Sequence, residues 1–588
     1  MQAHNKPFQE ITKMTITRVA RGCYVLALML LAQTFAAASS DIADAAMNRN
    51  KDAVRSLLQK KVDVNSTQVD GTTALHWAVR AADLETADLL IRAGANVSIA
   101  NRDGVTPMQL AAVNGTATMI DKLIKAGANP NAPLSKFGDT ALMLAARTGK
   151  IDGIKLLLDN GGQVNAIETW GGTTALMWAV SERHLDVVKM LIAHGADVNA
   201  RSYFVPSAHG RGFEGATPES PKPDQKVDEL AGGWLTPLMF AAREGDLEIA
   251  RVLIAAGADL NAIAGDGKDA LGLAIFNGQY ELASFLIDNH ANVNHADAQR
   301  FTPLFWAVDR RNMELGTNGF PWTVTTDPLP LIKKLLDAGA DPNAVVNNTP
   351  RGRNRNASPR IVFASALHRA AFAGDLELCK LLLAHGANPH AVSSDRESML
   401  EAAAGLALIP GYQLSHPNAE RVELSKLLVE LGEDVNWADA YGITPLMAAA
   451  NLGNTPLVQY LVDKGADLGA YDLGKRLDGA FMASVEPLMP VDYAIGVGTF
   501  LPNNSVEYHA ETSELMLRLM KEKGIKHTTS ECTLRGFSCS IVNVDPKTAT
   551  PAEIVKMRRL ATGNQLTGIT GGLSVKEKEQ DKDKQDKK

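Results

Sequence analysis

A short glycine motif is the first feature of the chain that suggests chemistry. Gly210, Gly212 and Gly215 have the spacing of a dinucleotide-binding loop, in which backbone amides hold a pyrophosphate at the start of a helix. That loop needs a strand before it and a helix after it, whereas Pro206 and Pro218 flank these glycines in a Pro-, Ser- and Gly-rich stretch. The glycines therefore favour an irregular loop, and we expect no cofactor.

The histidines are dispersed along the chain. His76 and His368 occupy the same position of a repeated phrase, where a hydrogen bond to an adjoining loop is a simpler role than general base catalysis. His290 and His295 flank a predicted hairpin loop without carboxylate or cysteine partners, so a two-histidine metal site is only an alternative. The sequence lacks the hydrolase nucleophile turn, the zinc-binding His-Glu-x-x-His helix and the P-loop. We expect no catalytic residue and no metal site.

The chain has four cysteines, which differ in their surroundings. Cys379 lies in an apolar helical pattern and is expected to be a small buried hydrophobe. Cys532 and Cys539 lie seven residues apart outside the repeated sequence, and in an oxidising compartment this spacing favours a local disulfide. A metal site is the alternative there, with His527 as the nearest further ligand.

An export signal is predicted at residues 1–40. Basic residues precede an apolar run from Cys23 to Leu31, and small residues follow it at 36–40, as in a cleaved signal peptide. The apolar run is short for a membrane span, which makes an uncleaved anchor the less favoured alternative. Either Met1 or Met14 can be the true start, because Met14 gives a more usual basic segment. We therefore expect a periplasmic or secreted protein without a membrane span after cleavage.

Composition excludes one broad class of partner. The 588 residues carry a formal net charge of −7, and the sequence pI is about 6.0. A nucleic-acid-binding domain usually shows an excess of basic residues, so no nucleic acid is expected as a partner.

A short phrase recurs along the chain at a nearly fixed interval. In each copy a Thr, Ser or Asp precedes an apolar anchor residue, and one or two Ala follow. The anchors are Leu75, Met108, Leu142, Leu176, Leu238, Leu271, Leu304, Leu367, Leu400 and Leu446. The first three steps are 33, 34 and 34 residues. Such a period predicts a stacked array of helix pairs rather than one globular core.

The ends of each predicted helix pair carry clear signals. Thr caps the first helix, and Pro often occupies its first position, as in Thr236-Pro237. A Gly ends the second helix, and an Ala-Asp-x-Asn turn follows, as in Gly257 to Asn261. These phrases, repeated in phase from Asp41 to Leu468, resemble those of the ankyrin-repeat family.

The resemblance implies an all-α solenoid of about 11–12 helix-turn-helix repeats, with short hairpin loops and several insertions. It also implies a concave groove lined by the loop tips and the first-helix surfaces. It says little about function, because ankyrin arrays bind very different partners.

Breaks in the spacing predict the organisation of the chain. The anchor spacing rises to 62 residues after Leu176, 63 after Leu304 and 46 after Leu400. Insertions of this kind leave a solenoid intact and add surface. The predicted parts are repeats at 41–200 (an N-terminal cap plus four), an insertion at 201–233, repeats at 234–525, a non-repeat segment at 526–575 and a disordered charged tail at 576–588. The later repeats are expected to contain insertions at 315–330, 345–363 and 405–419, and to end in a degenerate cap.

Residues that vary at a fixed repeat position are candidates for partner binding. Five residues after the anchor, the early copies carry Arg80, Arg147 and Arg243, and later copies carry Phe276 and Phe372. Two further candidates, Trp170 and Trp322, lie where no repeat core needs them. The alternatives are a solvated surface for the arginines and local loop packing for the tryptophans. Trp77, Trp178 and Trp306 alternate with leucines at one position, so they are expected in the inter-repeat core.

The sequence thus predicts an exported, monomeric scaffold that binds a partner protein without catalysis. One alternative is an enzyme or enzyme-accessory activity carried by the insertions or the C-terminal segment. The other is a secreted effector that binds host proteins.

Overall fold

Paired helices account for nearly all the regular structure. The computed structural model describes residues 41–134, 137–205, 232–312, 326–345, 365–393, 395–405, 416–473, 487–495 and 509–528. Within these ranges the chain forms 24 helices, which follow one another as helix-turn-helix pairs, and two strands of two residues each. The predicted all-α solenoid of about 11–12 repeats is confirmed. The described residues divide into two compact units, which meet in sequence at Asp266 and Gly267.

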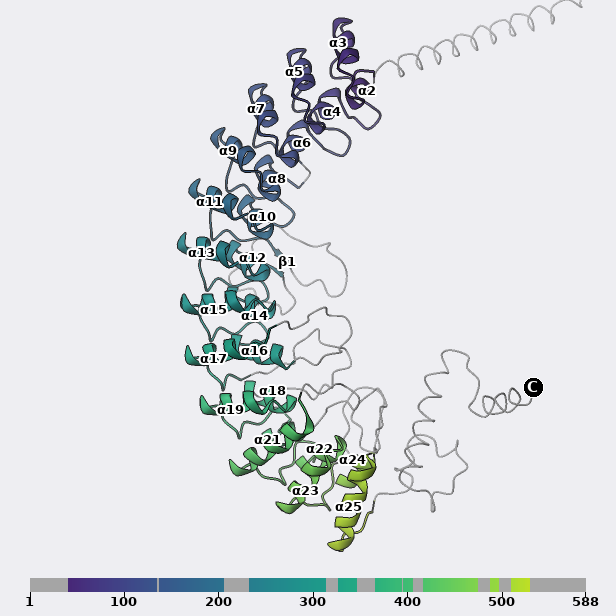
Figure 1. The fold of residues 1–588 in the computed structure, drawn as a ribbon, viewed down its shortest axis with the longest axis vertical. Helices are drawn as coiled ribbons and strands as arrows, with labels where there is room; N and C mark the ends of the chain where they lie inside the picture. Colours follow the sequence, from purple (N-terminus) through teal and green to yellow (C-terminus); the bar gives the residue numbers. More distant parts are fainter. Residues whose placement is uncertain are drawn as a thin grey trace, which may run out of the picture. The chain divides into compact units, whose positions relative to one another are not determined.

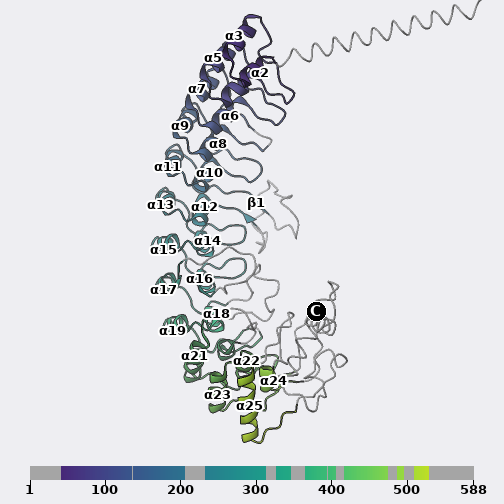
Figure 2. The ribbon, with the colours of Figure 1, turned by 45° about the vertical axis from the view of Figure 1, so that its right-hand side comes forward.

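Unit 1 contains six pairs. Its first helices are α2 (Asp41–Met47), α4 (Ala74–Arg80), α6 (Pro107–Asn114), α8 (Ala141–Thr148), α10 (Ala175–Ser181) and α12 (Pro237–Glu244). Its second helices are α3 (Lys51–Gln59), α5 (Leu84–Arg92), α7 (Ala117–Lys125), α9 (Ile151–Asp159), α11 (Leu185–Ala193) and α13 (Leu247–Ala255). The first helices form one layer and the second helices another, and the hairpin loops leave the first layer on its far side (Figures 1 and 2). Strands β1 (Phe204–Val205) and β2 (Gly232–Gly233) pair antiparallel, with Phe204 opposite Gly233.

Unit 2 also contains six pairs. Its first helices are α14 (Ala270–Phe276), α16 (Pro303–Arg311), α18 (Ala366–Ala373), α20 (Met399–Ala404), α22 (Pro445–Asn451) and α24 (Pro490–Ile495). Its second helices are α15 (Tyr280–Asp288), α17 (Leu329–Asp337), α19 (Leu376–Ala384), α21 (Asn418–Glu430), α23 (Thr455–Asp463) and α25 (Ala510–Glu522). Consecutive first helices pack against one another throughout the unit.

The first helices begin where the sequence places a capping side chain. At ten starts, the side-chain oxygen accepts a hydrogen bond from the backbone N–H three residues later. The capping residues are Thr73, Thr106, Thr140, Thr174, Thr236, Asp269, Thr302, Ser365, Ser398 and Thr444. This bond satisfies one of the amides that the first turn leaves without an intrahelical partner.

The core lies between the two layers and between neighbouring pairs. All ten anchor residues are at most 3% exposed, and Cys379 is fully buried, as predicted. His76 extends from α4 to the next repeat, where its Nε2 lies 2.9 Å from the carbonyl oxygen of Val105. The predicted loop-bonding role of His76 is therefore confirmed.

The second helices end at glycines in the left-handed conformation. Eight of these glycines have φ between 84° and 99°. They are Gly94, Gly127, Gly195, Gly257, Gly339, Gly386, Gly432 and Gly465. A Cβ added at Gly257 would meet no atom within 4 Å, so the backbone conformation rather than crowding selects glycine there. His290 stands at the equivalent position after α15 with a φ of 65°.

One asparagine after each of several repeats bonds to the next repeat. Asn165 donates from Nδ2 to the carbonyl oxygen of Gly195 (2.9 Å) and accepts from the backbone N–H of Asp197 (2.8 Å). The same two bonds recur at seven positions among the described residues, here named the asparagine ladder. Its members are Asn65, Asn131, Asn165, Asn199, Asn294, Asn343 and Asn436.

Two predicted insertions leave the ladder intact. Asn199 bonds to Gly257 and Asp259 on the far side of residues 201–233, at 3.0 and 2.7 Å. Asn343 bonds to Gly386 across residues 345–363, at 2.9 Å. The chain can therefore leave the stack at a loop and return without changing the contact between neighbouring pairs.

Several predictions fall on residues outside the described ranges. These are the signal at 1–40, the loop glycines at 210–215, Trp322, most of the predicted insertions, the non-repeat segment from 529 with Cys532 and Cys539, and the charged tail at 576–588. They stay predictions. Among the helices that are described, none combines the length and apolar character needed to cross a bilayer.

Replacing Gly257 with Val is expected to lower the free energy of unfolding by more than about 1 kcal/mol, because a β-branched residue is strained at positive φ. Denaturant unfolding at constant m-value measures the loss. The control is Ala256→Val, since Ala256 is equally exposed and has a φ of −86°. The converse change, His290→Gly, should stabilise the chain. An unchanged midpoint for Gly257→Val would contradict this account of the helix end.

Replacing Asn199 with Ala should cost roughly 1–2 kcal/mol, because two hydrogen bonds between repeats are lost at an exposed site. The control is Asn160→Ala, because the Asn160 side chain donates to the Leu156 carbonyl in the helix just before it and not to another repeat. Equal losses in the two variants would show that bonds between repeats carry no special weight.

Candidate partner-binding face

Three exposed arginines occupy one repeated position on the first helices of unit 1. Arg80 ends α4, Arg147 lies in α8 and Arg243 lies in α12. The helices α4, α6, α8, α10 and α12 pack in that order, so this position traces a line across one face. Arg80, Arg147 and Arg243 are here named the arginine row.

Each member of the row lies over an aromatic ring. The guanidinium carbon of Arg80 is 5.4 Å from the ring centre of Trp77 in the same helix. Arg147 reaches to the neighbouring repeat and lies 5.3 Å from the ring centre of Trp178. The third pair is Arg243 over Phe240, at 5.0 Å. A ring face attracts the cation and orients its plane, while the edge N–H groups stay available to an acceptor.

The row has few acidic neighbours. Glu182 lies 3.7 Å from Arg147, and both side chains are about half exposed. Glu244 lies 2.9 Å from Arg243, its neighbour in sequence. Among the described residues, no carboxylate pairs with Arg80. Surface pairs of this kind contribute little, so a partner's carboxylate can compete for them.

Three tryptophans, Trp77, Trp178 and Trp306, were predicted to lie in the inter-repeat core. Trp306 in unit 2 is 5% exposed and fits that prediction. Trp77 and Trp178 are only half buried, and their indole N–H groups donate to Gln68 and Thr173. Trp77 and Arg80 are three residues apart, so they share one helix face, and this spacing could have predicted their contact.

Small and apolar residues separate the arginines. Val113 holds the row position on α6 and is 49% exposed, and Ser181 holds it on α10. At the row position the first helices therefore alternate between an arginine and an uncharged residue, one repeat at a time.

The loop tips beside this face carry exposed aromatic residues. Trp170 is 56% exposed, and Phe137 in the preceding loop is 39% exposed. The buried carboxylate of Glu168 accepts from the backbone N–H groups of Trp170, Gly171 and Thr173, at 2.6–2.9 Å. The backbone N–H of Thr169 donates to the carbonyl of Phe137, which joins the two tips. Trp170 thus presents its ring from a loop that is held in place.

In unit 2 the equivalent repeat positions do not form the apolar surface that was expected. Phe276 is half buried, and its ring meets Trp306 edge to face at a centroid distance of 5.1 Å. Phe372 is only 4% exposed, so it offers almost no surface to a partner, contrary to expectation. The end of α18 is bonded to a later repeat, since the buried Arg421 of α21 donates to the Phe372 carbonyl at 2.9 Å.

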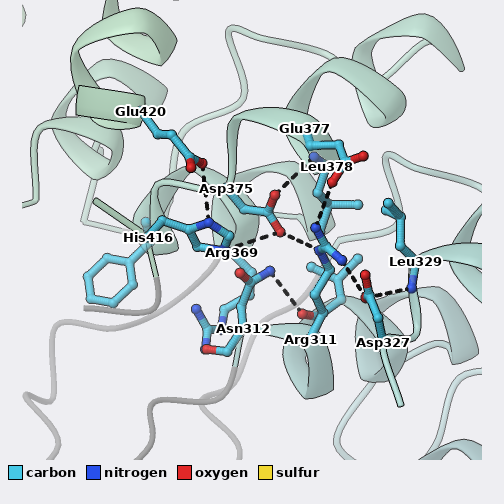
Figure 3. A network of polar contacts seen from close by, with 12 residues as sticks. Arg311, Asn312, Asp327, Leu329, Arg369, Asp375, Glu377, Leu378, His416 and Glu420 are labelled. Carbon is cyan, nitrogen blue, oxygen red and sulfur yellow. Dashed lines mark hydrogen bonds and ion pairs between the residues drawn. The ribbon is translucent and has the colours of Figure 1, made fainter. Parts of the chain in front are cut away.

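A buried ionic network occupies unit 2 instead (Figure 3). At its centre Asp375 caps α19 through the N–H of Leu378 (3.1 Å) and accepts from Nε of Arg311 (2.7 Å). His416 Nε2 lies 3.6 Å from the same carboxylate, and Arg311 also bonds to Asp327. Asp327 and His416 stand just before α17 and α21, so the network fixes the chain where these two helices begin. These pairings give the buried charges partners of opposite sign, so a structural role is sufficient to explain them.

No group of three or more His, Cys, Asp or Glu in the described ranges is placed to hold a metal ion. Burial raises the pKa of the Cys379 thiol well above its usual value, which disfavours the reactive thiolate.

Comparison with known sequences identifies the repeats. A family model described as "Ankyrin repeats (3 copies)" matches residues 42–134, 110–202, 231–315 and 414–472, and a single "Ankyrin repeat" model matches residues 364–394. These matches cover more than half of the chain. The chain belongs to the ankyrin-repeat family. Ankyrin-repeat domains are typically protein-binding scaffolds and usually non-catalytic.

Similar proteins share about a quarter of their aligned residues with this ankyrin-repeat chain. The ankyrin repeat protein YahD of Escherichia coli (strain K12) is 26% identical over 228 residues, which are 39% of this chain and 95% of that protein. Inversin of Homo sapiens is 25% identical over 241 residues, which are 40% of this chain and 19% of that protein. The crystal structure of the human ASB11 ankyrin repeat domain is 26% identical, with a TM-score of 0.32, over 40% of this chain and 91% of that one.

Two buried titratable residues lie in neighbouring ankyrin repeats of unit 2. Burial lowers the pKa of His368 from 6.5 to about 4. Burial, together with the nearby Asp439, raises the pKa of Glu401 well above its usual value. The Oε2 atom of Glu401 accepts from the Ser398 N–H at 2.6 Å, which completes a helix cap.

Replacing Glu401 with Gln is expected to raise the free energy of unfolding at pH 7. A carboxyl whose pKa is raised in the folded state loses stability as pH rises above its unfolded value of 4.5, and Gln avoids this loss. The amide oxygen can still accept from Ser398. Denaturant unfolding should show the gain at pH 7 and little difference near pH 4.

Replacing His368 with Gln should change the pH dependence of stability in the opposite direction. A histidine with a lowered folded pKa contributes stability above pH 6.5 that is lost as pH falls toward 4, up to roughly 3 kcal/mol at 1.36 kcal/mol per pKa unit. The variant should flatten this slope whatever its absolute stability. Parallel pH profiles for both variants and the parent would contradict the assigned pKa directions.

Proposed function

We propose that this protein is an exported scaffold that binds a partner protein through the arginine row and the adjoining loop tips of unit 1. The observation that carries the proposal is the repeated stacking of Arg80, Arg147 and Arg243 on aromatic rings across one face. A solvated surface does not require such an arrangement, because a stacked guanidinium gives up rotational freedom.

Rigidity supports the proposal further. Each first helix is capped and anchored, so the row and the Trp170 loop need little ordering when a partner binds. Aromatic residues and arginine are the side chains most often found at the energetic centre of protein interfaces. The proposed activity is binding alone.

The proposed compartment is the periplasm or the cell exterior. Its support is the sequence of residues 1–40, with a basic segment, an apolar run and small residues in order.

Reversing two charges of the row, in Arg147→Glu with Arg243→Glu, should reduce partner capture at least about tenfold, because two favourable contacts become repulsive. The measurement is cross-linking in the producing cell, followed by fractionation and identification of the captured protein. The matched control is Arg92→Glu, an exposed arginine on the second helix α5.

Unaltered capture by the double variant would remove the arginine row from the proposal. Recovery of the chain in the cytoplasm with residues 1–40 retained would contradict export. Circular dichroism of each variant establishes that the helices are intact before capture is compared.

A further inference from the structure

We propose that the arginine row binds an extended acidic segment of the partner, with carboxylates about five or six residues apart and an apolar side chain midway between them. This inference rests on the proposed function and adds the chemistry of the partner.

The spacing follows from helix packing. One first helix separates Arg80 from Arg147, and another separates Arg147 from Arg243. Packed helices lie about 8–10 Å apart, so the backbone positions of successive arginines are about 16–20 Å apart. An extended chain advances about 3.3 Å per residue, and five or six residues span that distance. A helical partner segment would need more than ten residues for the same span, at about 1.5 Å per residue.

The charge pattern favours isolated carboxylates over a continuous polyanion. Each guanidinium carbon lies 5.0–5.4 Å from the centre of its ring, and a guanidinium can bind one planar carboxylate through two N–H groups. Glu182 and Glu244 lie beside two of the arginines, and a closely spaced row of phosphates would meet them as well. The half-exposed ion pair of Arg147 with Glu182 is long, at 3.7 Å, so an incoming carboxylate can replace it.

Uncharged residues lie between the arginines, and they determine which partner side chains fit between the carboxylates. Val113 lies between Arg80 and Arg147 along the face and exposes 49% of its surface. Ser181 lies between Arg147 and Arg243 at the row position of α10, next to Glu182 in sequence. The exposed ring of Trp170 belongs to the loop that leads into the same helix, α10. An apolar side chain of the partner near each of these points is matched, whereas a charge there would be desolvated without a partner.

The test uses fluorescein-labelled peptides and the full chain. One peptide carries three glutamates about six residues apart, with leucines about midway, in a host of Gly, Ser and Ala. The second has the same composition with the glutamates about three residues apart. Fluorescence anisotropy should give at least about tenfold tighter binding of the first peptide, and the affinity should fall between about 50 mM and about 500 mM salt.

Variants assign the binding to the row. Arg80→Ala and Arg147→Ala should each weaken binding of the first peptide roughly three- to tenfold, since each removes one charge-assisted contact. Arg147→Lys should lose part of the affinity, because it keeps the charge without the planar fork. The control variant Arg92→Ala should leave binding unchanged. Circular dichroism establishes that all four variants retain the parent helices.

Three results would overturn the inference. The first is equal binding of the two peptides, and the second is an equal loss in Arg92→Ala. The third is tighter binding of a single-stranded oligonucleotide of matched length, which would indicate a polyanion site. If the peptides fail while capture in cells still depends on Arg147 and Arg243, the acidic segment is excluded and the proposed function stands. If neither depends on the row, both proposals fall.

Discussion

The asparagine ladder is the contact on which the rest of the array depends. The last carbonyls of a second helix are satisfied within the repeat, as Ile192 and Leu191 accept from the N–H groups of Gly195 and Ala196, whereas the carbonyl of the stop glycine is bonded by the preceding repeat. Asn165 supplies a donor to the Gly195 carbonyl and at the same time accepts from Asp197, so one side chain fixes both the distance and the register of the next repeat. The glycine must take a positive φ to present that carbonyl, which couples the helix stop to the ladder. The chain can extend a loop between two repeats, as between Asn199 and Gly257, because neither bond involves the loop.

With stacking assigned to the ladder, the caps and the buried anchors, other positions are left to vary. The position five residues after the anchor shows two different uses. In unit 1 it holds exposed arginines over aromatic rings, whereas in unit 2 the equivalent Asp309 is buried and pairs with Arg369 at 2.9 Å. The same repeat position thus forms an exposed surface in one unit and an internal contact in the other. Which use applies depends on neighbours in other repeats and not on the position itself.

That dependence explains what the sequence could and could not predict. Thr73 and Gly257 act within a few residues of themselves, so their roles as cap and stop follow from local spacing. The loop-bonding role of His76 could be predicted because its partner lies one period away. The surroundings of Phe372 could not, because its carbonyl bonds to Arg421, 49 residues further along the chain and beyond an irregular spacing of repeats. The contact of Arg147 with Trp178 could not be predicted for a related reason, because it joins two repeats and the repeat position does not show toward which neighbour the arginine side chain extends.

The arginine row and the two buried titratable residues of unit 2 differ in how they respond to protons. Arginine keeps its charge throughout the pH range in which proteins fold, so the arginine row is a constant feature of unit 1. Unit 2 instead buries His368 in its neutral form and raises the pKa of Glu401, and these residues oppose each other as pH changes. Acid favours charging of the histidine and destabilises the fold, while it relieves the cost of burying the glutamate. In unit 2 these two groups therefore act in opposite directions as pH changes, whereas the charge of the arginine row in unit 1 stays constant.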